Sequence, residues 1–179
     1  MTDTPANSTP PQSSATWRAM TEGDLGAVAS IAARVHVAYP EDDAVFAERL
    51  TLYPDGCFIL DSQSGPLGYM ISHPWHLGQP PALNIMLGTL PAPASTYYLH
   101  DLALLPQARG LGAGPRIVTR LVQHASAQQH RNLSLVAVNN SSSFWRRQGF
   151  SPLQDQALAD KLASYDAEAC YMLRELNAA

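Results

Sequence analysis

The sequence predicts a single α/β domain in which strands and amphipathic helices alternate around one sheet. Three observations at the centre of the chain support this fold class. The aromatic and aliphatic run over 96–105 is typical of a strand. It leads through a glycine-rich turn into a pattern of helical period over 115–129, and the apolar run 133–138 is typical of a buried strand. A chain of 179 residues has the length of one ordinary domain.

The N-terminal part is predicted to supply a strand and two helices. Alternation over 16–20 predicts a short strand. Thr21 is placed to cap a helix that ends before Pro40, and a second amphipathic helix is expected over 43–52. Residues 1–15 have almost nothing to bury, so we expect a disordered tail there and the folded domain over 16–179.

A hairpin and a long proline-rich segment follow. The runs 57–60 and 67–71, separated by turn-forming residues, predict two paired strands. Between 74 and 95 prolines interrupt any long element, which leaves one expected short helix near 83–87. A loop of this length inside a compact domain is usually functional or disordered.

The C-terminal part is predicted to end the fold with one helix and two strands. A short helix is expected over 141–148, with Gly149 at the position that closes helices. Phe150 is expected to start a strand, and the last strand is expected over 169–176.

Composition and charge exclude several classes of function. The net charge is −4 and the Lys and Arg residues are scattered, so nucleic acid is not an expected partner. Cys57 and Cys170 are too few for a disulfide framework and are expected to be reduced. The chain has no secretory signal pattern and no run of about 20 apolar residues, so we expect no membrane partner and a cytoplasmic location.

The glycine-rich turn is built to hold an anion. Gly110, Gly112 and Gly114 allow backbone N–H groups to curl inward, and the N-terminus of the following helix adds partial positive charge. No Gly-Lys-Ser/Thr follows, so the turn is not an NTPase P-loop, and its spacing does not fit a dinucleotide fingerprint. The alternatives at this point are a different pyrophosphate ligand and a connector without a ligand.

Two motifs resemble the GNAT acyltransferases. Gln107-x-x-Gly110-x-Gly112 is similar to the acetyl-CoA signature of that family, and the Leu-Ala-Leu-Leu-Pro run before it is typical of the same proteins. The block 141–150 resembles the family's second helix, and the order of the elements also matches. The resemblance implies a GNAT-type mixed, mostly antiparallel sheet flanked by helices.

The resemblance also implies acetyl-CoA as co-substrate, and no metal is expected. In the family, the backbone amides of this turn bind the CoA pyrophosphate, and the preceding strand pairs with the pantetheine arm. The residues that it assigns to the cofactor are Leu102, Ala103, Leu104, Gln107, Arg109, Gly110, Leu111, Gly112, Ala113, Gly114, Asn140, Ser143 and Trp145.

The sequence departs from the family pattern at two places. Val138 stands where the family often has an Asn, so the amide of Asn140 either reaches the cofactor or caps the next helix. Trp145 stands where the family usually has the Tyr that protonates the leaving thiolate. An indole N–H is too weak an acid for that task, so Trp145 either steadies the sulfur or packs in the core.

Candidate catalytic groups lie on the strand before the turn. His100 is the predicted base, and Asp101 is the alternative base or an orienting partner. A period of two would place Tyr98, His100 and Leu102 on one face and Asp101 on the other. Tyr98 is the candidate replacement for the missing acid, as is Tyr171.

The stretch His73-Pro74-Trp75-His76 is interpreted as aromatic lining of the acceptor pocket rather than as a metal site. By the family's geometry, the loop 76–95 on this side is the expected specificity element.

The predicted function is transfer of an acetyl group from acetyl-CoA to a primary amine of a small molecule or peptide, by direct attack in a ternary complex. The alternative is an inactive acyl-CoA-binding GNAT-like domain that acts as a sensor or scaffold. A nucleotide-binding α/β protein is disfavoured because no Lys follows the glycines. The acceptor remains unassigned, and a homodimer is left open as the assembly.

Overall fold

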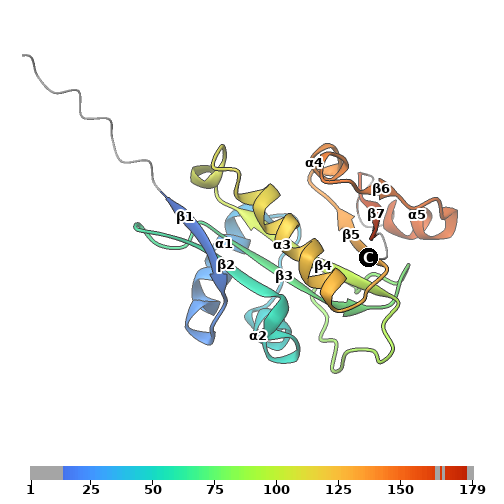
Figure 1. Cartoon of the computed structure of the whole chain (residues 1–179), viewed down its shortest axis with the longest axis horizontal. Coiled ribbons are helices and arrows are strands. Elements are labelled where there is room, and N and C mark those ends of the chain that lie inside the picture. The colour runs from blue at the N-terminus through green and yellow to red at the C-terminus, as the bar shows by residue number, and fades with distance from the viewer. Residues whose placement is uncertain (1–13, 164–165, 167, 177–179) are drawn as a thin grey trace, which may run out of the picture.

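A computed structural model describes residues 14–163, 166 and 168–176. Within these residues seven strands form one sheet in the order β1-β2-β3-β4-β5-β7-β6 (Figure 1). Strands β4 and β5 run parallel, and the other neighbouring pairs run antiparallel. The predicted mixed, mostly antiparallel sheet flanked by helices is therefore confirmed.

The elements of the first half lie close to their predicted positions. They are β1 (Ala15–Ala19), α1 (Leu25–Val35) after a short 3-10 turn, α2 (Asp43–Leu52), β2 (Cys57–Ser62) and β3 (Gly68–Trp75). Strand β1 begins one residue before the predicted domain boundary, and the rest of the predicted tail, residues 1–13, lies outside the described part of the chain.

The second half contains the central unit and the C-terminal strands. Its elements are β4 (Thr96–Leu104), α3 (Ala113–Ala127), β5 (Asn132–Ala137), α4 (Ser142–Arg147), β6 (Ser151–Pro152), α5 (Gln156–Ala163) and β7 (Cys170–Glu175). Helix α5 was not predicted, because its eight residues bury only Leu158 and Leu162, which is too short a pattern to recognise. The strand expected from Phe150 is limited to the two residues of β6.

The helix expected near 83–87 is wrong, because the segment has no regular structure. Its backbone groups bond to side chains of α2 instead of to one another. The Glu48 carboxylate accepts from the N–H groups of Leu87 and Gly88, both at 2.8 Å, and Arg49 Nη2 donates to the Ile85 carbonyl at 2.8 Å. Long-range partners therefore override a weak local helical pattern.

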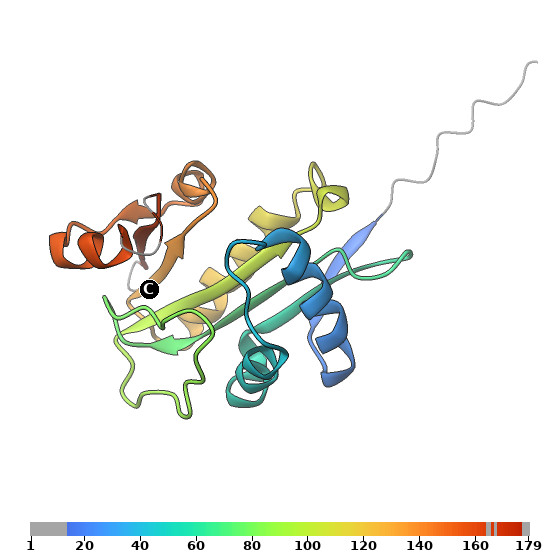
Figure 2. The same ribbon diagram turned by 180° about the vertical axis from the view of Figure 1, so that it is seen from behind.

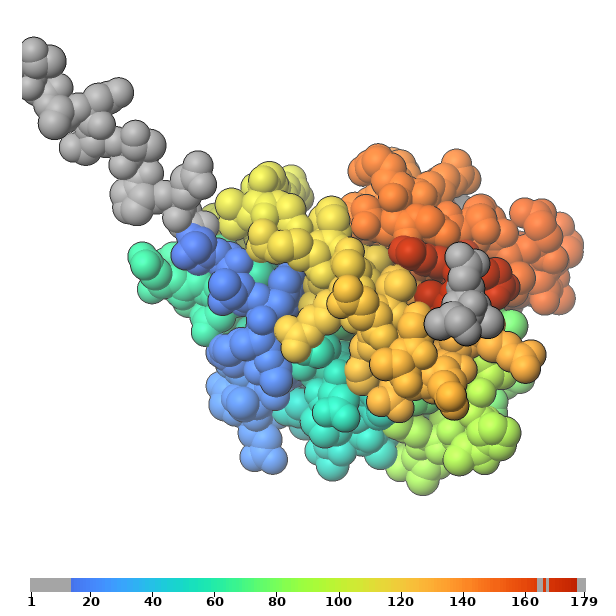
Figure 3. Space-filling model, viewed as in Figure 1, coloured from blue at the N-terminus to red at the C-terminus, as the bar shows by residue number. Residues whose placement is uncertain are grey.

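Helices pack on both faces of the sheet. One core joins the apolar side of α3, including Ile117 and Leu121, to Tyr97 and Leu99 of β4. Figure 3 shows the outer side of α3 forming the middle of the surface on this face. A second core joins α1 and α2 to β2 and β3 on the opposite face, which is seen in Figure 2. Helix α5 packs against Tyr98 on that same face as α1 and α2.

We predict that two glycines respond in opposite ways to alanine. A Cβ at Gly56 would lie 2.0 Å from the Ser72 carbonyl oxygen, which is backbone and cannot move cheaply. Gly56→Ala should therefore lower the free energy of unfolding by roughly 1–3 kcal/mol. Gly26 lies in α1 with nothing within 4 Å of the added carbon, so Gly26→Ala should raise stability by about 0.5–1 kcal/mol. Urea denaturation measures both changes, and wild-type stability for Gly56→Ala would contradict this packing.

Candidate functional site

The site forms where β4 and β5 separate. Their pairing is confined to Tyr97–Leu99 against Leu133–Leu135. Beyond Leu99, residues 100–104 of β4 have no hydrogen-bonded neighbour on the β5 side in the described residues. An unpaired strand edge of this kind can pair with an extended ligand.

Backbone alternation shows which residues of β4 face the opening between the two strands. The Leu105 N–H donates to the Leu67 carbonyl at 2.8 Å, so its backbone points to the β3 side. The backbone groups of Leu104 and Leu102 therefore point toward β5. Ala103 is turned away, since its carbonyl lies against Gly68 of β3 and its side chain is buried against α1 and α2. This orientation argues against the predicted contact of Ala103 with a cofactor.

A β-bulge at His100 corrects the predicted face assignment. Asp101 lies opposite Ile71 and Leu99 lies opposite Ser72, so His100 is an extra residue in β4. The bulge breaks the alternation, and His100 and Asp101 both face one pocket with Tyr98, while Leu102 packs in the core under α3. Period-two counting placed His100 and Asp101 on opposite faces because it cannot detect an inserted residue.

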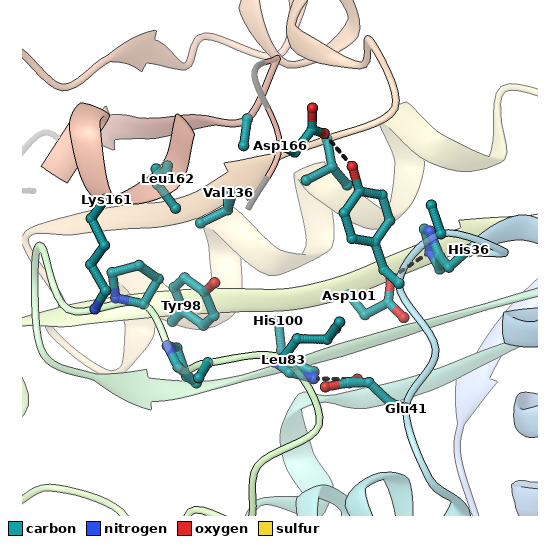
Figure 4. A pocket seen from close by; sticks show the side chains of 17 residues that line it. His36, Glu41, Leu83, Tyr98, His100, Asp101, Val136, Lys161, Leu162 and Asp166 are labelled. Carbon is teal, nitrogen blue, oxygen red and sulfur yellow. Dashed lines mark hydrogen bonds and ion pairs between the residues drawn. The ribbon is translucent and has the colours of Figure 1, made fainter. Parts of the chain in front are cut away.

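This pocket has a volume of about 260 Å³ and is shown in Figure 4. Its floor is β4, and its walls come from the α1–α2 connection, the segment 80–83, α5 and the chain near β5 and β7. Figure 2 shows the α1–α2 connection crossing over β4. Elements far apart in the sequence therefore meet over Tyr98, His100 and Asp101.

His100 is held by a carboxylate that the sequence did not indicate. Its Nε2 lies 3.0 Å from Glu41 Oε2, and their side chains are only 8% and 7% exposed. Burial raises the pKa of Glu41, but the hydrogen bond and charge of His100 outweigh burial and bring that pKa below its usual value. Glu41 lies in a connecting segment 59 residues from His100, so no local spacing links the pair.

Asp101 already has partners at both of its oxygens. Oδ2 accepts from the Tyr69 hydroxyl, and Oδ1 lies 2.8 Å from His36 Nε2, although the ring N–H is not aimed straight at it. Burial raises the pKa of Asp101. His36 and Tyr69 lower that pKa by more than burial raises it, so it falls below its usual value. This carboxylate is placed to orient its neighbours rather than to accept a proton.

Tyr98 forms the apolar part of the floor. It packs against Leu158, Leu162 and Tyr171, and burial raises the pKa of the Tyr98 hydroxyl above its usual value. Tyr171, the other candidate acid, accepts a hydrogen bond at 3.1 Å from the Gly78 N–H. Burial also raises the pKa of Tyr171.

The residues predicted to line an acceptor pocket, His73, Trp75 and His76, lie outside this pocket. None of them is among its lining residues. His73 is buried between Trp75, Tyr98 and His100, and burial together with the charge of His100 lowers its pKa to about 3. Trp75 Nε1 donates to the Gln79 carbonyl at 2.7 Å. Within the described residues no group of three or more His, Cys, Asp or Glu side chains could hold a metal.

The glycine turn lies at the other end of β4. Gly110 and Gly112 have φ of +80° and +65°, and both are exposed, with nothing within 4 Å of an added Cβ. Gly112 is the N-cap of α3, so the following N–H groups have no acceptor inside the helix. The exposed Gln107 and Arg109 and the half-buried Leu111 complete the turn. Its open, positively polarised backbone is suited to a phosphate group.

Gly114 has a different role. A Cβ there would lie 3.1 Å from Phe144 Cζ, so this glycine allows α3 to pack closely against α4. The buried Ala113 carbonyl accepts from Trp17 Nε1 at 2.9 Å, which ties the start of α3 to β1.

Trp145 lies in the core of the protein. Its ring contacts Phe144 and Phe150, and Nε1 donates to Ser141 Oγ at 3.2 Å. The geometry therefore favours the packing interpretation of Trp145 over contact with a sulfur atom. Asn140 does not cap α4, because Ser141 is the N-cap, and Asn140 is an exposed residue with φ of +57°. Ser143 is exposed on the outside of α4.

The sequence matches a known family over most of the chain. The profile of the Acetyltransferase (GNAT) family matches residues 27–150, which include both motifs and most of the pocket floor. The chain belongs to the GNAT family of acetyltransferases. No curated protein matches the chain at a significant level.

Solved structures show the same fold. N-acetylglutamate synthase from Neisseria gonorrhoeae, in complex with coenzyme A and N-acetyl-glutamate, is 16% identical with a TM-score of 0.65; the match covers 93% of this chain but 36% of that protein. A GNAT-like decarboxylase, GphF, in complex with isobutyryl-CoA is 15% identical with a TM-score of 0.68. The match covers 90% of this chain and 100% of that protein. The ribosomal-protein-S18-alanine N-acetyltransferase from Escherichia coli is 15% identical, with 93% and 96% covered and a TM-score of 0.63. At these identities the likeness establishes the fold alone.

None of the helices in the described residues is long and apolar enough to cross a membrane.

We predict that Gly112→Val weakens acetyl-CoA binding at least about ten-fold, because a β-branched residue strains the left-handed conformation that aims the N–H groups. Gly88→Val is the matched control. Gly88 has φ of +71°, also has nothing within 4 Å of an added Cβ, and lies in the segment between β3 and β4, away from the glycine turn. Calorimetric titration should show a loss for Gly112→Val alone, although both variants lose some stability. Equal affinities would show that the turn does not hold the cofactor.

Proposed function

We propose that this protein transfers an acetyl group from acetyl-CoA to a primary amine of a small molecule or peptide, by direct attack in a ternary complex. Membership of the GNAT family supports acyl transfer in general. Structures of similar fold that contain coenzyme A or isobutyryl-CoA support a CoA-based co-substrate. The observation that carries the proposal is the His100–Glu41 pair, which lies in a pocket where β4 leaves β5.

The proposed binding mode follows the direction of β4. The pyrophosphate would lie on the N–H groups of the turn 109–114, and the pantetheine arm would pair with the β4 backbone at Leu102 and Leu104. The thioester would then reach the pocket beside His100. Acetyl-CoA supplies the activated acyl group, and the protein supplies position and proton transfer.

The amine must lose a proton before it attacks. A lysine-like ammonium has a pKa of about 10, so a positioned base accelerates the step by roughly 10²–10⁴-fold. Because Glu41 engages Nε2, Nδ1 is the nitrogen of His100 left to accept the proton. The Glu41 carboxylate then stabilises the imidazolium that forms. The amine lone pair forms the new C–N bond. The nitrogen then gives its second proton to water, and the tetrahedral intermediate collapses to the amide as the C–S bond breaks.

The oxyanion and the leaving group require less from side chains. A backbone N–H on the unpaired side of β4 is placed to donate to the carbonyl oxygen as charge develops. Tyr98 is the candidate hydrogen-bond donor to the leaving sulfur. Its raised pKa keeps the hydroxyl protonated but makes complete proton transfer to a thiolate unfavourable. The thiolate therefore leaves with a hydrogen bond and takes its proton from water.

An inactive acyl-CoA-binding domain is the second candidate. Trp145 favours it, because the residue in the position of the family's usual acid is buried and bonded to Ser141. The two candidates differ in one measurement, since a sensor would bind acetyl-CoA without releasing free CoA in the presence of any amine.

We predict that His100→Gln lowers kcat/KM by roughly 10²–10⁴-fold at neutral pH and removes the rising limb of its pH profile. The loss should shrink as the pH approaches the pKa of the amine, where free amine is abundant. Glu41→Gln should lower the rate less, because His100 is still present but the carboxylate no longer stabilises the imidazolium that forms.

His76→Gln is the control, since His76 is exposed and outside the pocket lining. Acetyl-CoA affinity should stay unchanged in all three variants. Nearly full activity of His100→Gln with an unaltered profile would remove His100 as the base.

A further inference from the structure

We propose that the acceptor is a small amine with an apolar body, one primary ammonium group and no carboxylate. This inference rests on the proposed function, because it concerns the pocket assigned to the acceptor.

Most of the wall is apolar. The segment Pro80, Pro81, Ala82 and Leu83 forms one side, and Val136, Val138, Leu162 and Ala169 form the other. Tyr98 extends this surface across the floor. Such a lining gains free energy by removing an apolar body from water, and it offers few groups that could replace the water around a second charge.

The charged groups of the pocket are mostly acidic, with Glu41, Asp101 and Asp166 against one Lys. His100 faces Glu41, and His36 faces Asp101, so each ring already has an acidic partner (Figure 4). Lys161 is the one Lys or Arg among the described lining residues, and it already interacts with another group of the protein. Asp166 adds a third carboxylate near the rim.

The neutral form of His100, which the reaction needs, strengthens the preference for an ammonium group over a carboxylate. His100 must be neutral to accept a proton, and the charge of Glu41 is then not compensated by its partner. An incoming ammonium group meets an acidic surrounding and is attracted, whereas a carboxylate beside it would be repelled. An amino acid would therefore bind more weakly than the amine with the same side chain.

The boundaries of the pocket limit the size of the acceptor. The Tyr39 hydroxyl donates to Asp166, which joins the α1–α2 connection to the chain after α5 (Figure 4). On another side, Asn84 Oδ1 accepts a hydrogen bond from the Asp42 N–H at 2.7 Å. The Asn84 N–H donates to Glu41 Oε1 at 3.2 Å. These contacts close two sides of the pocket, so we expect a small amine to enter more easily than an extended peptide.

The test is equilibrium binding of three ligands to the full chain by calorimetry, with and without coenzyme A. The ligands are phenethylamine, phenylalanine, and a tripeptide amide that begins with phenylalanine. We expect phenethylamine to bind at least about ten-fold more tightly than phenylalanine or the tripeptide amide. The unpaired carboxylate of phenylalanine and the loop contacts that the tripeptide displaces each cost about ten-fold in affinity. Phenylalanine or the tripeptide binding as tightly as phenethylamine, or no binding by phenethylamine, would overturn the proposal.

Two matched variants test the charge argument. Asp166→Asn removes a lining charge. It should reduce the ratio of the affinity for phenethylamine to the affinity for phenylalanine by roughly two- to five-fold. Asp160→Asn removes a carboxylate of α5 that bonds to Gln156 outside the lining, and it should leave the ratio unchanged. An unchanged ratio in Asp166→Asn would contradict the role of this charge. The test measures binding and not turnover, so tighter binding of phenylalanine would overturn this inference and leave the proposed function intact.

Discussion

The separation of β4 from β5 is the constraint on which the rest of the site depends. Parallel pairing stops at Leu99 and Leu135, so the second half of β4 keeps one backbone edge without a strand partner in the described residues. Unpaired edge groups are costly when buried, and they become useful when a ligand with amide groups completes the ladder. The same separation opens the space in which the thioester of the proposed co-substrate would meet an acceptor.

The bulge at His100 converts this opening into a chemical site. An ordinary strand would have sent His100 and Asp101 to opposite faces, whereas the extra residue turns both toward the pocket. Each then finds a partner on the α1–α2 connection, His100 with Glu41 and Asp101 with His36. His100 is the proposed base, whereas both oxygens of Asp101 are already engaged. We therefore assign the two His–carboxylate pairs different tasks, proton transfer to one and orientation to the other.

The sequence predicts the parts of the fold that depend on local patterns. Strand β4, the glycine turn and α3 follow from periodicity and turn chemistry within one stretch of chain, and α2 was predicted at its observed bounds. The bulge and Glu41 could not be predicted, because each depends on partners distant in the sequence. Trp145 shows the same limit: its position in the second motif predicted a contact with the sulfur as one option, but its surroundings in the fold favour packing.

The central claim is that the opening between β4 and β5 brings a CoA thioester to His100. A crystal structure of the complex with coenzyme A tests it most directly. We expect the pyrophosphate on the N–H groups of residues 109–114, the pantetheine arm beside Leu102 and Leu104, and the thiol at the pocket near His100. Coenzyme A bound elsewhere, or with its thiol directed away from His100, would contradict it.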